Sequence, residues 1–156
     1  MHIISPNKVI RGRNAWQKSL PEILKISKFP LLLGRSPITR SLRSEIAKDL
    51  NQLNLKVYNA ELEFDCCEED LTRIYNLAIE QECDSVITAG GGKVLDAGKL
   101  LAEYLSVPCI TVPLSASTCA GWTALGNIYS KEGKFIKDVK LKSCPKLLVC
   151  DHSFIN

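Results

Sequence analysis

Short apolar runs that alternate with helical segments constrain the fold of this chain more than any other feature. The predicted strands are the runs 30–34, 56–60, 85–88, 107–112 and 147–149. The predicted helices, in which apolar residues recur every three or four positions, span 14–27, 36–53, 68–81 and 94–105. Strands that alternate with helices indicate an α/β fold with a mostly parallel sheet that is covered on both faces. Right-handed crossovers then make the sheet open and doubly wound, in the Rossmann-like manner.

Local signals refine this outline at two places. Ser36 is a candidate cap for the second helix, and Pro37 suits the first helical position. Near the end of the chain, residues 127–129 and 135–136 flank Lys131-Glu132-Gly133, which predicts a small β-hairpin with glycine in its turn. No repeat or linker interrupts the sequence, so we expect residues 1–156 to form one domain.

The run Gly90-Gly91-Gly92 follows the strand at 85–88 and precedes the next helix. Glycine in a regular element costs about 0.5–1 kcal/mol relative to alanine, so packing alone explains three in a row poorly. A helix start offers free N–H groups and the positive end of the dipole, which suit an anion, and Lys93 adds a charge. The Walker loop and the GxGxxG fingerprint both fail here, because Ile87, Val94 and Leu95 stand where they need other residues. The turn therefore predicts a phosphate cradle of a different pattern.

A second loop, residues 112–118, also leaves the carboxyl end of a predicted strand. Its hydroxyl and backbone N–H groups are expected to face the same crevice as the glycines, which is where open α/β sheets bind ligands. Taken alone, a loop rich in serine and threonine is more often a helix cap than a binding site.

Charge and cysteine content exclude several function classes. The net charge is only +3 and the basic residues are scattered, which argues against nucleic acid as a partner. No run approaches the ~20 apolar residues of a membrane span, and the N-terminus lacks a signal-peptide core, so we expect a cytoplasmic protein without a membrane partner. The seven cysteines form no CxxC pair and indicate small core residues in a reducing compartment.

The two loops together resemble the iron-containing alcohol dehydrogenase and glycerol dehydrogenase superfamily, and the likeness runs from about residue 9 to 151. The matching residues are 90–99 (GGGKVLDAGK), 107–108 (VP), Pro113, 116–118 (AST), 124–125 (AL), 128–129 (IY), 132–133 (EG) and Phe135. The combination is specific, whereas each piece alone is weak. The likeness is greatest to the glycerol dehydrogenase branch.

The resemblance implies a site for a dinucleotide, NAD or NADP. It places the pyrophosphate on Gly91, Gly92 and Lys93, and sets Asp96 beside the cofactor. It nominates Ser117 from the second loop as a further contact. Around the hairpin, it implies cofactor contacts at Thr123, Leu125 and Tyr129.

The sequence departs from the family pattern at three other positions. Arg35 follows Gly34 where the family has an acidic residue that binds the adenosine ribose. A guanidinium there suits the 2′-phosphate of NADP, or indicates weakened NAD binding, or is simply solvated. Leu114 replaces the usual threonine. Cys119 occupies the place where glycerol dehydrogenases carry aspartate near the substrate, and it is either a reactive thiol or an inert buried cysteine.

Family members carry a second, helical domain whose aspartate and histidines bind Zn²⁺ or Fe²⁺. With only His2 and His152 available, we expect no metal site in this chain, which would be the N-terminal part of a two-domain enzyme and not catalytic alone. The function implied is cofactor binding for a metal-dependent alcohol or polyol dehydrogenase, with a small alcohol as substrate. Three alternatives remain open: a glycerol-1-phosphate dehydrogenase, a 3-dehydroquinate synthase-like domain, and a non-catalytic, homo-oligomeric dinucleotide-binding module.

Overall fold

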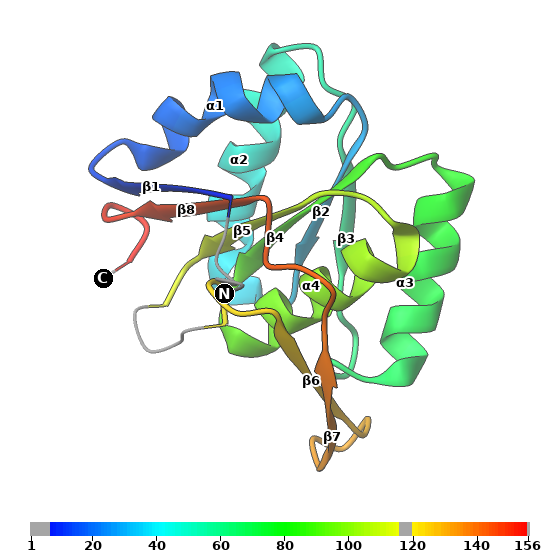
Figure 1. The fold of residues 1–156 in the computed structure, drawn as a ribbon. Helices are drawn as coiled ribbons and strands as arrows, with labels where there is room; N and C mark the ends of the chain where they lie inside the picture. The colour runs from blue at the N-terminus through cyan, green and yellow to red at the C-terminus, as the bar shows by residue number, and fades with distance from the viewer. Residues whose placement is uncertain (1–6, 116–119, 156) are drawn as a thin grey trace.

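A six-stranded parallel sheet forms the centre of the molecule, with strand order β1-β8-β5-β4-β2-β3 (Figure 1). The computed structural model describes residues 7–115 and 120–155. The strands of this sheet are β1 (Lys8–Gly12), β2 (Pro30–Gly34), β3 (Tyr58–Glu61), β4 (Ser85–Gly90), β5 (Cys109–Pro113) and β8 (Leu147–Asp151). The predicted parallel, doubly wound α/β fold is therefore confirmed.

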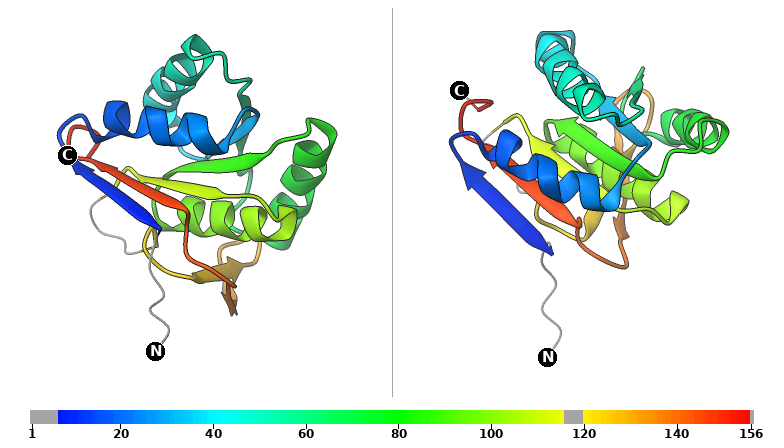
Figure 2. Two further views of the ribbon diagram at one scale, coloured as in Figure 1. Left: turned by 45° about the horizontal axis from the view of Figure 1, so that its top comes forward. Right: turned by 90° about the horizontal axis from the view of Figure 1, so that it is seen from above.

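Among the described residues, four α-helices cover the sheet, two on each face. They are α1 (Ala15–Ile26), α2 (Arg40–Gln52), α3 (Glu68–Glu80) and α4 (Gly92–Leu105). Two further views show α1 and α2 on one side of the sheet and α3 and α4 on the other (Figure 2). Each layer has its own core, because alternate strand residues point to opposite faces: Leu32 and Ile87 pack with α1 and α2, whereas Leu31 and Val86 pack with α3 and α4.

The predicted hairpin is also present, and it is longer than the sequence suggested. Strands β6 (Leu125–Tyr129) and β7 (Phe135–Lys140) pair antiparallel outside the main sheet. Gly133 has a φ of +90°, which a glycine in the turn adopts without strain. Ile128 packs into the core beneath α4, so the hairpin is attached to the helix that follows the glycine turn.

Several predicted boundaries were wrong by a few residues. The second helix does not begin at Ser36: Pro37–Thr39 form a separate 3₁₀ turn, in which the Ser36 hydroxyl accepts a hydrogen bond from the Ile38 amide, and α2 starts at Arg40. The strand predicted at 85–88 extends through Gly90, because its pairing with β5 continues to Pro113. Gly90 is thus the last strand residue, and only Gly91 links the strand to the helix.

Half of the six described cysteines lie in the core as predicted, and Cys83, Cys144 and Cys150 are only partly buried. Cys66, Cys67 and Cys109 are buried, and all six cysteines in the described part of the chain are free thiols. Burial raises the pKa of Cys109 to about 12, so this thiol stays protonated at neutral pH.

Candidate functional site

The strand order reverses at β2, and the glycine turn follows the neighbouring strand β4 at this point. From β2 the chain passes through α2 to β3 on one side, and then through α3 to β4 on the other side of β2. The carboxyl ends of β2 and β4 therefore lie next to each other, with Leu33 opposite Thr88. Such a switch point is the usual ligand crevice of an open α/β sheet.

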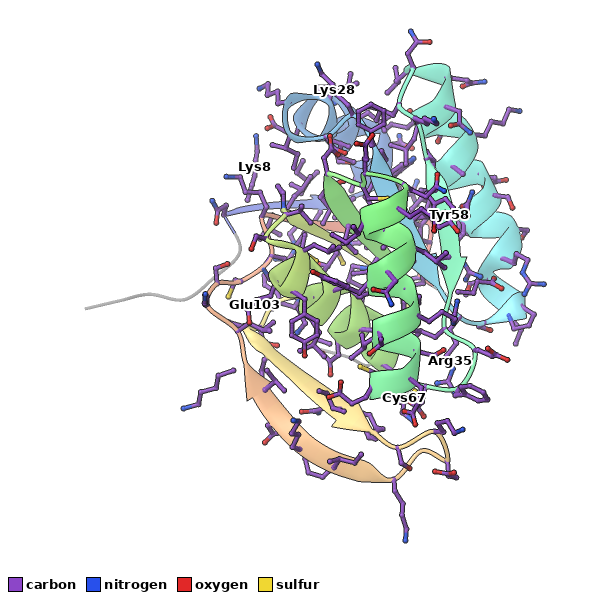
Figure 3. The ribbon with its side chains drawn as sticks, turned by 90° about the vertical axis from the view of Figure 1, so that its right-hand side faces the viewer. Lys8, Lys28, Arg35, Tyr58, Cys67 and Glu103 are labelled. Atoms are coloured by element: carbon purple, nitrogen blue, oxygen red, sulfur yellow. The ribbon has the colours of Figure 1, made fainter. Side chains whose placement is uncertain are left out.

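A hollow of about 270 Å³ opens at this point, which we call the crevice. The residues that line it come from the end of β2 and from the start of α4: Arg35, Ser36, Thr39, Gly90, Gly91, Gly92, Lys93 and Val94. Figure 3 shows Arg35 at the same end of the molecule as Cys67, with Lys28 at the opposite end of β2. The structure thus brings the predicted residues Arg35, Gly91, Gly92 and Lys93 together.

Gly91 presents bare backbone to the crevice. Its φ of −87° and ψ of −170° are extended values that any residue adopts. A Cβ built on Gly91 would meet nothing within 4 Å, whereas one on Gly90 would touch Val94 at 3.0 Å. The first α-helical bond of α4 runs from the Leu95 amide to the Gly91 carbonyl, so the amides of residues 92–94 have no acceptor within the helix. Neither the fold nor packing requires glycine at position 91.

A buried carboxylate, missed by the sequence analysis, holds the two cationic side chains of the crevice. Asp65, in the loop between β3 and α3, lies 2.8 Å from the Lys93 ammonium and 3.8 Å from Arg35. Its side chain is only 3% exposed, whereas those of Lys93 and Arg35 are more than a third exposed. The only available signal was that Asp65 follows the carboxyl end of a strand.

The Lys93 ammonium also lies over the ring of Tyr129, 4.5 Å from its centroid. Tyr129 ends β6, so the predicted hairpin contact reaches the edge of the crevice. The other two predicted hairpin residues lie further along α4. Thr123 and Leu125 accept hydrogen bonds from the ammonium of Lys99, which is 2% exposed.

Asp96 is engaged within the protein. Its carboxylate accepts a hydrogen bond from the Asn127 amide at 3.1 Å and pairs with Lys99 at 3.2 Å. Burial raises the pKa of Asp96 above its ordinary value, despite the nearby lysine. Asp96 does not line the crevice. The contacts show that it fastens β6 to α4, and its predicted place beside a cofactor stays a prediction.

At the end of β2, next to Gly34 and Arg35, the structure places a second cationic side chain, which the sequence did not predict there. The guanidinium of Arg43, from α2, bonds to the Ser36 carbonyl, the Thr39 hydroxyl and the Glu61 carboxylate. Arg43 is 5% exposed. No feature of the sequence distinguished Arg43 from the other basic residues of this helix.

Two predicted residues, Ser117 and Cys119, lie outside the described residues. The loop that carries them leaves β5 beside the glycine turn, since the Leu114 amide donates to the Gly90 carbonyl at 3.0 Å. Within 7–115 and 120–155, no group of three or more His, Cys, Asp or Glu side chains could hold a metal ion. Over the same residues, no helix is both long and apolar enough to cross a membrane.

Comparison with known proteins gives consistent matches over nearly the whole chain. The family model for iron-containing alcohol dehydrogenase matches residues 6–152. An uncharacterized oxidoreductase of Synechocystis is 37% identical over 97% of this chain and 39% of its own length. A glycerol dehydrogenase of Escherichia coli is 30% identical over 98% of this chain and 42% of its own length. The crystal structure of glycerol dehydrogenase from Schizosaccharomyces pombe superposes with a TM-score of 0.86 at 25% identity, covering 99% of this chain and 39% of that one.

Proposed function

Because this chain belongs to the iron-containing alcohol dehydrogenase family, we propose that it forms the cofactor-binding domain of an NAD(P)-dependent alcohol or polyol dehydrogenase. Glycerol dehydrogenases among its relatives support a polyol as substrate. The chain spans about two fifths of the length of these relatives. The oxidation of the alcohol is therefore assigned to the whole protein, and cofactor binding to these residues.

The observation that carries the proposal is the bare backbone at Gly91. An alanine would fit there in both space and conformation, so the fold gives no reason for glycine. The close approach of a ligand does give one, because a Cβ would project into the open space of the crevice. The ligand at such a place is an anion, since the free amides and the dipole of α4 point toward it.

A dinucleotide pyrophosphate fits this arrangement. In our proposal it rests on Gly91 and Gly92, and Lys93 supplies a charge from one side. Tyr129 borders the same side, and the resemblance nominates Ser117 as a further contact. The bound cofactor supplies hydride transfer with the alcohol, and the residues named here hold and orient it.

The cationic end of β2 favours NADP over NAD. Arg35 lines the crevice where the family carries an acidic residue for the ribose hydroxyls. Glu61, at the end of neighbouring β3, is already bound by Arg40 and Arg43. A guanidinium that is 36% exposed at this point suits a 2′-phosphate.

The described residues do not fit a metal centre, as they contain no suitable cluster of ligands. Any contribution of Zn²⁺ or Fe²⁺ to the reaction is therefore assigned to residues outside 7–115 and 120–155. Those described here contribute the cofactor site.

Titration with NADPH and NADH tests this proposal, with ligand fluorescence or quenching of the two tryptophans as the readout. We expect saturable binding of both, with NADPH tighter, and loss of that preference in Arg35→Asp. Lys28→Asp, at the opposite end of β2, makes the same charge change and should leave the preference intact. No saturable binding of either nucleotide would overturn the cofactor proposal. Equal affinities would overturn only the preference for NADP.

A further inference from the structure

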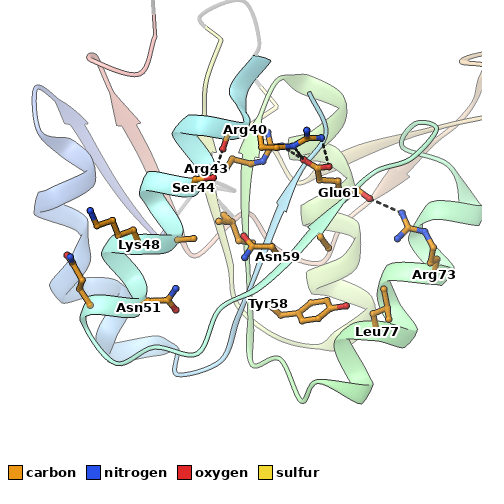
Figure 4. A pocket seen from close by; sticks show the side chains of 14 residues that line it. Arg40, Arg43, Ser44, Lys48, Asn51, Tyr58, Asn59, Glu61, Arg73 and Leu77 are labelled. Carbon is orange, nitrogen blue, oxygen red and sulfur yellow. Dashed lines mark hydrogen bonds and ion pairs between the residues drawn. The ribbon is translucent and has the colours of Figure 1, made fainter. Parts of the chain in front are cut away.

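A hollow larger than the crevice lies elsewhere in the described part of the chain. It is a groove of about 910 Å³ that runs along the free edge of β3, and we call it the edge groove. Strand β3 pairs with β2 on one side only, so its other side is open. Figure 4 shows side chains of α2, among them Lys48 and Asn51, on one wall, and Arg73 and Leu77 of α3 on the other. The edge groove shares no lining residue with the crevice.

The floor of the edge groove offers unpaired backbone groups. The Lys56 amide donates to Lys28 and the Leu62 amide donates to Gly34, so even-numbered residues of this segment face β2. Alternation along the strand then turns the amide and carbonyl of Asn59 to the free edge. The Glu61 carbonyl also faces outward and is bound by Arg73 at 2.8 Å, which closes one end of the groove. An added strand thus finds its pairing groups around Asn59.

Charge selects what can lie in the groove. Four basic side chains, Arg40, Arg43, Lys48 and Arg73, line it against one acidic side chain, Glu61. The Lys48 side chain is exposed, so its charge is accessible to a ligand. Apolar groups of Leu32, Ala47, Ala60 and Leu77 lie between these charges. The lining therefore matches an extended segment that carries acidic side chains together with small apolar ones.

We propose that the edge groove binds an extended acidic peptide, which adds to the free edge of β3 as a further strand. A second copy of this chain is the poorer occupant, because pairing β3 with β3 would set two basic linings against each other. The pairing with Asn59 supplies affinity, and Lys48 with the arginines supplies selectivity for acidic side chains. This site is independent of the proposed cofactor site.

Fluorescence anisotropy with two labelled octapeptides, (Glu-Val)₄ and (Lys-Val)₄, tests the proposal. We expect the acidic peptide to bind saturably and the basic peptide not to bind. Asn59→Pro removes the outward amide and leaves the bonds to β2, since proline is tolerated on an edge strand whose N–H faces solvent. The proline variant should weaken peptide binding about tenfold, which corresponds to the loss of the hydrogen bond from the residue 59 amide. Asn59→Ala keeps the amide and should bind within about threefold of wild type.

Lys48→Glu supplies a test that does not depend on how well the proline variant folds. It should lower the affinity for the acidic peptide about fivefold at low salt. Lys137→Glu, on exposed β7, makes the same charge change and should have no effect. Equal binding of both peptides, or no saturable binding, would overturn the proposal. So would self-association in sedimentation experiments that Asn59→Pro abolishes, because it would identify a second copy as the occupant.

Discussion

The guanidinium of Arg43 fills the space beside Gly34 that a side chain at position 34 would need. A Cβ on Gly34 would lie 2.0 Å from Arg43 Nε. The cation at this point is held by three acceptors from different segments, namely the Ser36 carbonyl, the Thr39 hydroxyl and the Glu61 carboxylate. The buried position of the Arg43 side chain therefore depends on glycine at position 34.

Gly34→Ala should destabilise the protein by about 1–2 kcal/mol, because Arg43 must leave its acceptors to make room. In an Arg43→Ala background the same change should cost less than about 0.5 kcal/mol, since the space is then empty. Urea unfolding of the four proteins of this cycle measures the coupling. Additive effects of the two substitutions would show that residues 34 and 43 do not compete for this space.

The outline of the fold could be predicted because the buried strands each carry a signal of their own, whereas the half-exposed β1 was not among the predicted strands. Strands β2 and β4 are buried along their whole length, so their sequences are apolar runs bounded by turn residues. The glycine turn was found for a similar reason: strand, turn and helix start are adjacent in the sequence. Local patterns therefore identified half of the crevice.

The rest of the site depends on contacts between distant segments. Asp65 meets Lys93 across 28 positions, and Arg43 meets Glu61 across 18. A partly buried ion pair of this kind leaves no periodicity, because each partner alone looks like a solvated charge in the sequence. The start of α2 was misplaced for a local reason, since Ser36 and Pro37 form a separate turn before the helix.

Gly91 and Gly98 offer a matched pair of substitutions with opposite consequences. A Cβ on Gly98 would lie 2.2 Å from Thr88 Cβ, so α4 would have to move away from β4. Gly98→Ala should therefore cost about 2–3 kcal/mol. Gly91→Ala should change stability by less than about 0.5 kcal/mol, because nothing lies near its Cβ.

Gly91→Ala should affect NADPH binding strongly, although it should hardly affect stability. Its Cβ would enter the crevice, so Gly91→Ala should weaken NADPH binding about tenfold or more. Thermal unfolding and NADPH titration of the same samples separate the two effects. A stable Gly91→Ala protein with unchanged NADPH affinity would remove the main support for the cofactor site.

Asp70 should make stability sensitive to acid. Burial alone would raise the pKa of this carboxyl, but the amides of Phe64, Asp65 and Glu63, together with Arg73, outweigh it and hold the pKa below its ordinary value of 3.8. A lowered folded pKa means that the stabilisation is present above the unfolded pKa and is lost as pH falls through the folded one.

Asp70→Asn should accordingly cost about 2 kcal/mol at pH 7, the value of charge-assisted hydrogen bonds to a buried carboxylate. The difference from wild type should shrink as the pH falls below about 4, because wild type then loses the same interactions. Urea midpoints at pH 7, 5 and 3 measure this. A difference that stays constant over that range would mean that the charge of Asp70 does not matter.

The Asp65 carboxylate offsets part of the positive charge that Lys93 and Arg35 bring to the crevice. Removing the charge of Asp65 should therefore change both stability and NADPH affinity. Asp65→Asn keeps the shape of the side chain and an acceptor for the Cys66 amide, which bonds to Asp65 at 2.7 Å. It leaves Lys93 and Arg35 without their shared anion, which should cost about 1–3 kcal/mol of stability. The freed cations should attract the cofactor phosphates, so NADPH should bind about three- to tenfold tighter at low salt.

The gain should fade as salt rises, because the freed side chains are partly exposed. NADPH titrations at about 20 and 300 mM NaCl separate attraction from positioning, since only attraction is screened over this range. Asp138→Asn, on exposed β7, changes the net charge equally and should leave NADPH binding unchanged. Weaker binding of Asp65→Asn at both salt concentrations would contradict the prediction. It would mean that Lys93 reaches the phosphates only when Asp65 holds it in place.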